Sequence, residues 1–129
     1  MGRDKALLAF RGTTFLEHLI AVLLPRIDPL VVVLGHHADL IRQVIPSGPQ
    51  VVVNPDYKRG MLTSLQAGIR ALPTTAKSAL FTLVDHPAVA AETLDLLIGE
   101  YEKTKPLIAI PRYGERRGHP VIAACTVLD

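Results

Sequence analysis

The sequence predicts a three-layer α/β fold built around a mostly parallel sheet. Apolar runs of strand length recur along the chain without alternating polar positions, which is typical of strands that are buried on both faces of a parallel sheet. Segments with helical spacing lie between these runs, and this alternation favours a layered fold with right-handed crossovers. The expected strands cover residues 30–34, 51–53, 79–84 and 107–110.

A helix is expected wherever an apolar stripe recurs with a helical period. The first helix is opened by a capping box from Thr14 to Glu17. Pro46 and Pro73 end the second and third helices, because proline cannot continue the backbone hydrogen bonds. In chain order, the stripes are Leu16, Leu19, Ile20 and Leu23; Leu40, Ile41, Val44 and Ile45; Leu62, Leu65, Ile69 and Leu72; and Leu94, Leu97, Ile98 and Tyr101.

The composition fits one compact globular domain and argues against nucleic-acid binding. The 129 residues are 49% hydrophobic and 20% charged, a balance that disfavours disorder. The net charge of +2 is spread along the chain except at Arg112, Arg116 and Arg117. A nucleic-acid-binding protein would instead need a basic stripe with interleaved aromatic side chains. The sequence contains no internal repeat and no interdomain linker.

The cysteine usage and the apolar runs favour a soluble cytoplasmic protein. Cys125 is the only cysteine, so an intramolecular disulfide is impossible. It lies in the apolar run VIAACTV, where a small core residue is the expected role. The longest apolar runs are shorter than a membrane span, and the N-terminus lacks the apolar region of a signal peptide. A reducing, cytoplasmic compartment is therefore expected.

Polar residues follow each expected strand. The segment after the first strand is Gly35-His36-His37, Asn54-Pro55-Asp56 follows the second, Asp85-His86-Pro87 the third and Pro111-Arg112 the fourth. The carboxyl ends of parallel strands meet at one edge of an open sheet, where ligands bind in a crevice. We therefore expect these polar groups to converge although they are far apart in the sequence.

Two of these strand-end residues have both a structural and a functional interpretation. Asp85 ends an apolar strand, where an acid is costly to desolvate unless it meets a cation. It is either the N-cap of the next helix or a ligand of Mg²⁺. Asn54 is either a turn former before Pro55 or part of a binding site.

Further candidates lie in two loops. Gly60 and Ser64 precede or open a helix, where free N–H groups and a hydroxyl favour an anion or a ribose, although an ordinary Ser or Thr cap fits the spacing equally well. His119 lies in RRGHP, which is either part of a site or a plain surface loop. His36 and His37 are poor metal ligands because adjacent side chains of an extended segment point in opposite directions. No GxxxxGK[ST], GxSxG or CxxC motif is present.

Five ordered motifs resemble the MobA-like NTP transferase family. They are MG-x-DKALL, GH after the first expected strand, NPDY-x-x-GM-x-TSL-x-AG, VDHP and RRGHP. The resemblance covers essentially the whole chain and is greatest to the molybdopterin cytidylyltransferase branch, whose members make molybdenum-cofactor dinucleotides. It implies a Rossmann-like nucleotidyltransferase fold.

The resemblance also implies that the chain is a single, incomplete nucleotidyltransferase domain over residues 1–129. MGRDK matches only the tail of the family's opening signature, LAAGxSxRMGxxK. The first strand, normally central in the sheet, and the C-terminal part with a DIDTP-like motif are therefore expected to be missing. Self-association through the exposed strand edges is expected as a result.

The resemblance assigns roles to residues at the matching motif positions. Lys5 and Asp85 would be catalytic, with Lys5 neutralising the triphosphate and Asp85 binding Mg²⁺. His86 departs from the family, which more often has Gln or another residue before the proline. The implied nucleotide-binding residues are Gly2, Lys5, Asn54, Gly60 and Ser64, and the implied acceptor-side residues are His86, Gly118, His119 and Pro120.

The reaction that the resemblance implies is transfer of a nucleoside monophosphate from a nucleoside triphosphate to a phosphorylated acceptor. CTP is favoured as the donor, molybdopterin is the implied acceptor, and pyrophosphate leaves. Two alternatives stay open at this point: transfer to a sugar phosphate or polyol phosphate, and a non-catalytic nucleotide-binding module.

Overall fold

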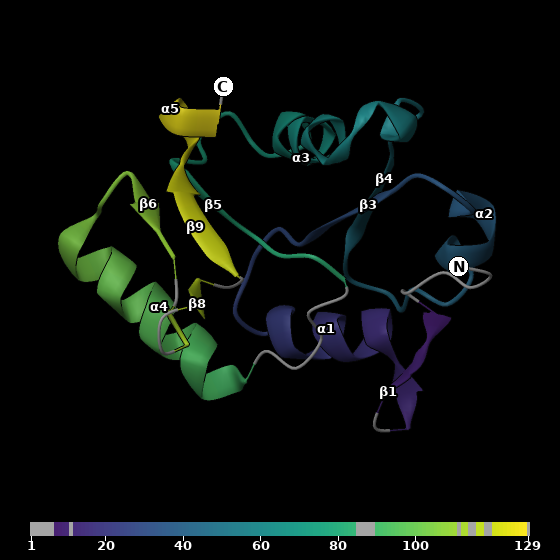
Figure 1. Ribbon diagram of the computed structural model, residues 1–129, viewed down its shortest axis with the longest axis horizontal. Helices are drawn as coiled ribbons and strands as arrows, with labels where there is room; N and C mark the ends of the chain where they lie inside the picture. The colour runs from purple at the N-terminus through teal and green to yellow at the C-terminus, as the bar shows by residue number, and fades with distance from the viewer. Residues whose placement is uncertain are drawn as a thin grey trace.

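The computed structural model describes residues 7–10, 12–84, 90–110, 112–113, 116–117 and 120–128, and it confirms the α/β class. Strands and helices alternate along most of the chain (Figure 1). The elements are β1 (Ala9–Phe10), β2 (Thr13–Thr14), α1 (Phe15–Leu23), β3 (Val31–Leu34), α2 (Ala38–Arg42), β4 (Gln50–Val53), the short 3-10 helix η2 (Tyr57–Arg59), α3 (Met61–Arg70), β5 (Ser78–Phe81), α4 (Ala91–Thr104), β6 (Ile108–Ala109), β7 (Arg112–Tyr113), β8 (Arg116–Arg117), β9 (Val121–Ala124) and α5 (Cys125–Leu128).

Helix α1 shows how the local sequence sets a helix start. The Thr14 hydroxyl oxygen accepts a hydrogen bond from the backbone N–H of Glu17 at 3.1 Å, which confirms the predicted cap. The Glu17 carboxylate accepts a bond from the same hydroxyl at 3.0 Å, in place of the backbone contact that a full capping box would make. The four residues of the predicted stripe, Leu16, Leu19, Ile20 and Leu23, are all buried.

The strands form a mixture of parallel and antiparallel pairs. Strands β3 and β4 run parallel, with Val31 opposite Gln50 and Leu34 opposite Val53. Strands β5 and β6 each pair antiparallel with β9, which lies between them. The antiparallel β9 was not predicted, because an apolar run such as VIAA indicates burial and carries no information on strand direction. Two short hairpins, β1–β2 and β7–β8, lie outside these sheets.

Helices cover both faces of the strands, which accounts for the three layers. In Figure 1, α3 lies on one side of the strands and α1 lies on the other, with α4 beside β6. One face of α1 packs with Leu34 and Ile41, and another part packs with Leu94 of α4. Leu94 is 0% exposed. Among the described residues, no helix has the length and apolar character needed to cross a membrane.

Candidate functional site

The side chain of Asn54 connects the end of β4 to the start of α3. Asn54 is only 3% exposed, and its Nδ2 donates hydrogen bonds to Thr63 Oγ1 at 2.9 Å and to Ser64 Oγ at 3.0 Å. Its Oδ1 accepts a bond from the backbone N–H of Asp56 at 3.0 Å. These contacts confirm the turn that Asn54 and Pro55 predict, and they use both hydrogens of the amide. Asn54 therefore positions the first turn of α3.

Thr63 extends this network back into the turn. Its Oγ1 lies 2.7 Å from the carbonyl oxygen of Gly60 and 3.1 Å from that of Asp56. The hydroxyl accepts from Asn54 and has a single hydrogen to donate, so these two carbonyl oxygens share it. Sequence reasoning did not single out Thr63, although its place beside Ser64 in GMLTSL was the available signal.

The N-terminus of α3 carries no side-chain cap. Its N-cap, Gly60, has φ 121° and ψ 167°, and no acidic residue lies in the first turn. A Cβ on Gly60 would meet no atom within 4 Å, so the backbone conformation is what requires glycine there. The Ser or Thr cap that the spacing allowed is therefore not formed. The first N–H groups of α3 and the helix dipole favour an anion at this end.

The loop after β3 contacts the segment after β4 through a glycine and a tyrosine. A Cβ on Gly35 would lie 2.5 Å from Tyr57 Cβ and 2.7 Å from Tyr57 Cγ, so only glycine allows this approach. His36 Nδ1 lies 3.2 Å from the Tyr57 hydroxyl oxygen. The backbone N–H of Asn54 also donates to the carbonyl oxygen of Leu34 at 2.7 Å. The ends of β3 and β4 therefore lie side by side, as the sequence predicts.

The two histidines of this loop are arranged differently from the sequence expectation. His37 has φ 56°, in the left-handed region, so the segment is not extended and the His36 and His37 rings lie with their centroids 3.7 Å apart. The opposite orientation was expected for an extended segment, and this segment is not extended. Within the described parts of the chain, no group of three or more His, Cys, Asp or Glu side chains could hold a metal ion.

Several predicted site residues lie outside the described residues. They are Gly2, Lys5, Asp85, His86, Gly118 and His119. Both interpretations of Asp85 therefore stay predictions. The N-cap of α4 is Ala90. Val84, which precedes Asp85, packs against the buried cluster that contains Leu34 at the end of β3.

The remaining predicted residues divide between the site and the interior. Asn54, Gly60 and Ser64 come together at the start of α3 through the hydrogen bonds described above. Pro120 directly precedes β9 and is fully buried, which makes it a packing residue at the start of that strand.

Comparisons with known proteins match this arrangement over the whole chain. The family model described as the MobA-like NTP transferase domain matches residues 1–129. The molybdenum cofactor cytidylyltransferase of Escherichia coli is 25% identical over 126 residues, which are 96% of this chain and 63% of that protein. A probable molybdenum cofactor guanylyltransferase of Bacillus cereus is 28% identical over 130 residues, with coverage of 95% and 60%. The chain thus spans about three-fifths of the length of these curated relatives.

Solved structures agree in fold. The crystal structure of Rv0371c from Mycobacterium tuberculosis superposes with a TM-score of 0.86 at 31% identity, over 98% of this chain and 65% of that chain. A second structure of Rv0371c, in complex with manganese, has a TM-score of 0.83, 31% identity and coverage of 98% and 68%. Together with the family match, these similarities confirm the predicted nucleotidyltransferase fold class.

Proposed function

Because this chain belongs to the MobA-like NTP transferase domain family, we propose that it binds a nucleoside triphosphate and transfers its nucleoside monophosphate to a phosphorylated acceptor. The observation that carries the proposal is the clamp formed by Asn54, Thr63 and Ser64. This clamp fixes the uncapped N-terminus of α3 at the carboxyl end of β4, where ligands of open α/β sheets bind.

The proposed reaction needs positioning and charge neutralisation and no covalent intermediate. A phosphate oxygen of the acceptor attacks the α-phosphorus in line, the new P–O bond forms, and the bond to the bridging oxygen of the leaving pyrophosphate breaks. Catalysis then comes mainly from holding the phosphates in place and stabilising their charge. The N–H groups at the start of α3 and the Ser64 hydroxyl would hold the nucleotide, and Lys5 would neutralise the phosphates.

A divalent cation is part of the proposal. Asp85 is the proposed ligand, because one carboxylate together with substrate phosphates and water is the usual environment of Mg²⁺. The manganese complex of Rv0371c supports use of a divalent metal. When bound, such an ion would supply charge neutralisation and orientation of the phosphates.

We further propose CTP as the preferred donor and molybdopterin as the acceptor. The support is the NPDY-x-x-GM-x-TSL motif together with relatives named as molybdenum cofactor transferases. Those relatives include both a cytidylyltransferase and a guanylyltransferase, so the donor base requires direct measurement. Isothermal titration of the chain with CTP and with GTP, each with Mg²⁺, decides it, and tighter binding of GTP would reverse the assignment.

Two serine variants test the site itself. Ser64→Ala removes the hydroxyl beside the α3 N-terminus and is expected to weaken CTP binding about tenfold, the effect of losing a hydrogen bond to a charged group. Ser47→Ala changes an exposed serine in the loop before β4 and is the matched control, with no expected change. Equal binding by both variants would remove Ser64 from the site.

Lys5→Ala is expected to slow turnover, and unchanged turnover would remove Lys5 from the mechanism.

The compartment and the self-association of the protein are proposed from its composition and from the exposure of its strand edges. We propose that residues 1–129 belong to one nucleotidyltransferase domain that works in the cytoplasm, a compartment that the single cysteine favours. We also propose self-association through open strand edges, because Leu107 and Ile108 at the β6 edge are 66% and 47% exposed. Sedimentation velocity over a range of concentrations tests it, and a monomer at every concentration would contradict it.

A further inference from the structure

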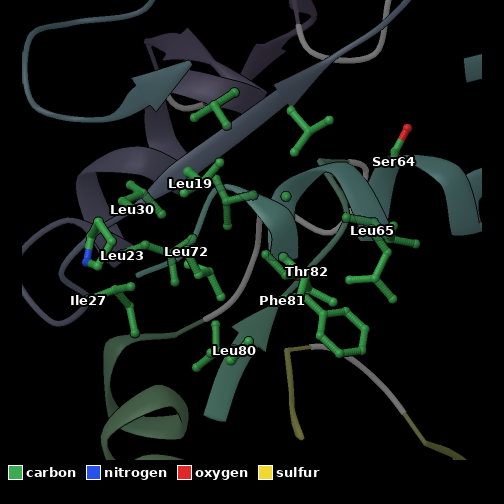
Figure 2. Close-up of a pocket in the computed structure, with 18 of the residues that line it drawn as sticks. Leu19, Leu23, Ile27, Leu30, Ser64, Leu65, Leu72, Leu80, Phe81 and Thr82 are labelled. Atoms are coloured by element: carbon green, nitrogen blue, oxygen red, sulfur yellow. The ribbon is translucent and has the colours of Figure 1, made fainter. Parts of the chain in front are cut away.

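Ser64 of α3 is one of the few polar residues beside a largely apolar cavity. The cavity has a volume of about 970 Å³ and lies between β3 and β5, which belong to separate sheets among the described residues. Figure 2 shows Leu19, Leu65 and Leu80 around it, with the Ser64 hydroxyl directed away from these leucines. The hydrogen-bond partners of this half-buried hydroxyl therefore lie on the side of the turn before α3.

The amide of Asn54 has a fixed orientation toward that hydroxyl. A backbone N–H can only donate, so the 3.0 Å bond from the Asp56 N–H identifies Oδ1 as the acceptor atom of the Asn54 amide. The amide nitrogen then faces Thr63 and Ser64, to which it donates at 2.9 Å and 3.0 Å. Because Asn54 is 3% exposed and both hydrogens of its nitrogen are used, it has no hydrogen left to donate to a ligand.

The two hydroxyls that accept from Asn54 differ in where their own hydrogens go. The hydrogen of Thr63 is directed to the backbone carbonyl oxygens of Gly60, at 2.7 Å, and Asp56, at 3.1 Å. A serine in a helix commonly donates to the carbonyl oxygen four residues earlier, which for Ser64 is the same oxygen of Gly60. Ser64 does not make that bond, and no other described residue accepts its hydrogen. Ser64 alone of the two therefore has a hydrogen to offer a ligand.

The bond from Asn54 determines what kind of ligand atom Ser64 can bind. A hydroxyl has one hydrogen and two lone pairs, and a bond received at a lone pair polarises the O–H and strengthens its donation. The matching ligand atom is one that accepts. Hydrogen bonds to an ionised acceptor are roughly twice as strong as neutral ones, which favours a phosphate oxygen over a ribose or base oxygen.

From these contacts we propose that Asn54 is a positioning residue, which holds the Ser64 hydroxyl as a donor to a phosphate oxygen of the nucleotide without touching the nucleotide itself. The inference rests on the proposed function, because it requires a nucleoside triphosphate at the start of α3. Thr63 takes no part in nucleotide binding, since its hydrogen is directed to the backbone. The three adjoining side chains thus have separate roles: Asn54 orients the hydroxyl, Ser64 binds, and Thr63 stabilises the turn.

A double-mutant cycle on CTP binding tests the proposal. Asn54→Asp replaces the amide nitrogen by a carboxylate oxygen, so the Ser64 hydroxyl donates to this carboxylate and is lost to the nucleotide. The carboxylate also repels the phosphates, but it does so with or without the hydroxyl, and the repulsion cancels in a cycle with Ser64→Ala. In isothermal titration with CTP and Mg²⁺, the double variant is expected to bind about tenfold more tightly than the product of the two single losses.

The matched control is the same cycle with Thr63→Ala in place of Ser64→Ala. Its losses in CTP affinity are expected to multiply, because the hydrogen of Thr63 does not reach the nucleotide. Circular dichroism at the titration temperature shows whether each variant is folded.

A second measurement needs no variant of Asn54. Exchange of its side-chain amide hydrogens in the original chain, followed by NMR, is expected to stay equally slow when CTP is added. Faster exchange of either hydrogen on binding would show that the amide leaves its hydroxyl partners, and this would overturn the proposal.

The cycle separates failure of this inference from failure of the proposed function. Losses that multiply in the cycle of Asn54 and Ser64, with CTP still bound, would overturn the inference alone. The coupling should persist when inorganic tripolyphosphate replaces CTP. Coupling that is seen with CTP and is absent with tripolyphosphate would place a ribose or base oxygen beside Ser64 and would overturn the phosphate assignment. No CTP binding by the original chain would contradict the proposed function, and the inference with it.

Discussion

The ends of β3 and β4 meet in a corner that contains Gly35, Asn54 and Tyr57. Its polar groups are hydrogen-bonded differently from those along the cavity between β3 and β5. At the corner, Asn54 makes three side-chain hydrogen bonds while almost fully buried, and Tyr57 rests directly on Gly35. Along the cavity, two strand edges face each other unpaired and the Thr82 hydroxyl has no partner among the described residues. The buried polar groups of the corner thus pair with one another, whereas the buried Thr82 hydroxyl beside the cavity does not pair with any described residue.

The largest expected effect comes from breaking the clamp at the corner. Asn54→Ala removes three hydrogen bonds and leaves the Asp56 N–H and two hydroxyls to find other partners, so we expect a loss of about 3 kcal/mol in the free energy of unfolding. Urea denaturation measures it. Asn54→Asp separates the contributions, because it still accepts from the Asp56 N–H and cannot donate to Thr63 or Ser64. A loss below about 1 kcal/mol for Asn54→Ala would contradict the clamp.

The contact of Gly35 with Tyr57 gives the next largest effect. Gly35→Ala places a methyl group 2.5 Å from Tyr57 Cβ, and the resulting displacement is expected to cost about 2 kcal/mol of stability. Gly99→Ala is the matched control in α4, where a Cβ would meet no atom within 4 Å. That change is expected to stabilise the protein by about 0.5–1 kcal/mol through helix propensity. Thermal unfolding of both variants should therefore shift in opposite directions.

A substitution beside the cavity should change the free energy of unfolding in the opposite direction from the substitutions at the corner. Thr82→Val replaces a buried hydroxyl, which has no partner among the residues that the structure describes, by a methyl group of similar size. We expect a gain of about 1 kcal/mol in the free energy of unfolding. Chemical denaturation of the variant beside the original chain measures it. Destabilisation would show that the Thr82 hydroxyl has a partner in solution and would weaken the contrast between the two regions.

The smallest effect is expected from the hydroxyl of Tyr57. Tyr57→Phe keeps the ring on Gly35 and removes only the exposed contact to His36, so a loss of about 0.5 kcal/mol or less is expected. Tyr57→Ala removes the ring as well and should cost clearly more. Equal losses for the two variants, measured by thermal unfolding, would assign the contact to the hydroxyl instead of the ring.

Local signals in the sequence predicted much of the secondary structure. The Thr14 cap and the stripe of α1 were both confirmed, because each depends on residues within a few positions of one another. Helix ends were less well predicted. The stripe of the second helix extends to Ile45, whereas α2 ends at Arg42, because an apolar residue can be buried in the turn that follows a helix. The strand runs were placed within a few residues for the same local reason.

The candidate site was predicted in part. The sequence indicated Asn54, Gly60 and Ser64 by their strand-end and helix-start positions, and the structure brings them together. It did not indicate Thr63, whose role depends on the path of the turn. Nor did it indicate why Gly35 is a glycine, because Tyr57 is 22 positions further along the chain and its ring reaches Gly35 only when β3 and β4 pair.

The sequence by itself determined the α/β class, the helix cap at Thr14 and the turn at Asn54, since each follows from apolar periodicity or from side chains that bond to their own neighbours. Only the tertiary structure decided the antiparallel direction of β9, the contact between Gly35 and Tyr57, and the cavity between β3 and β5. These features depend on which edges meet after distant segments come together. Apolar runs predict which segments are buried. They do not predict the direction of a strand, the strand with which it pairs or the space that is left between two strands.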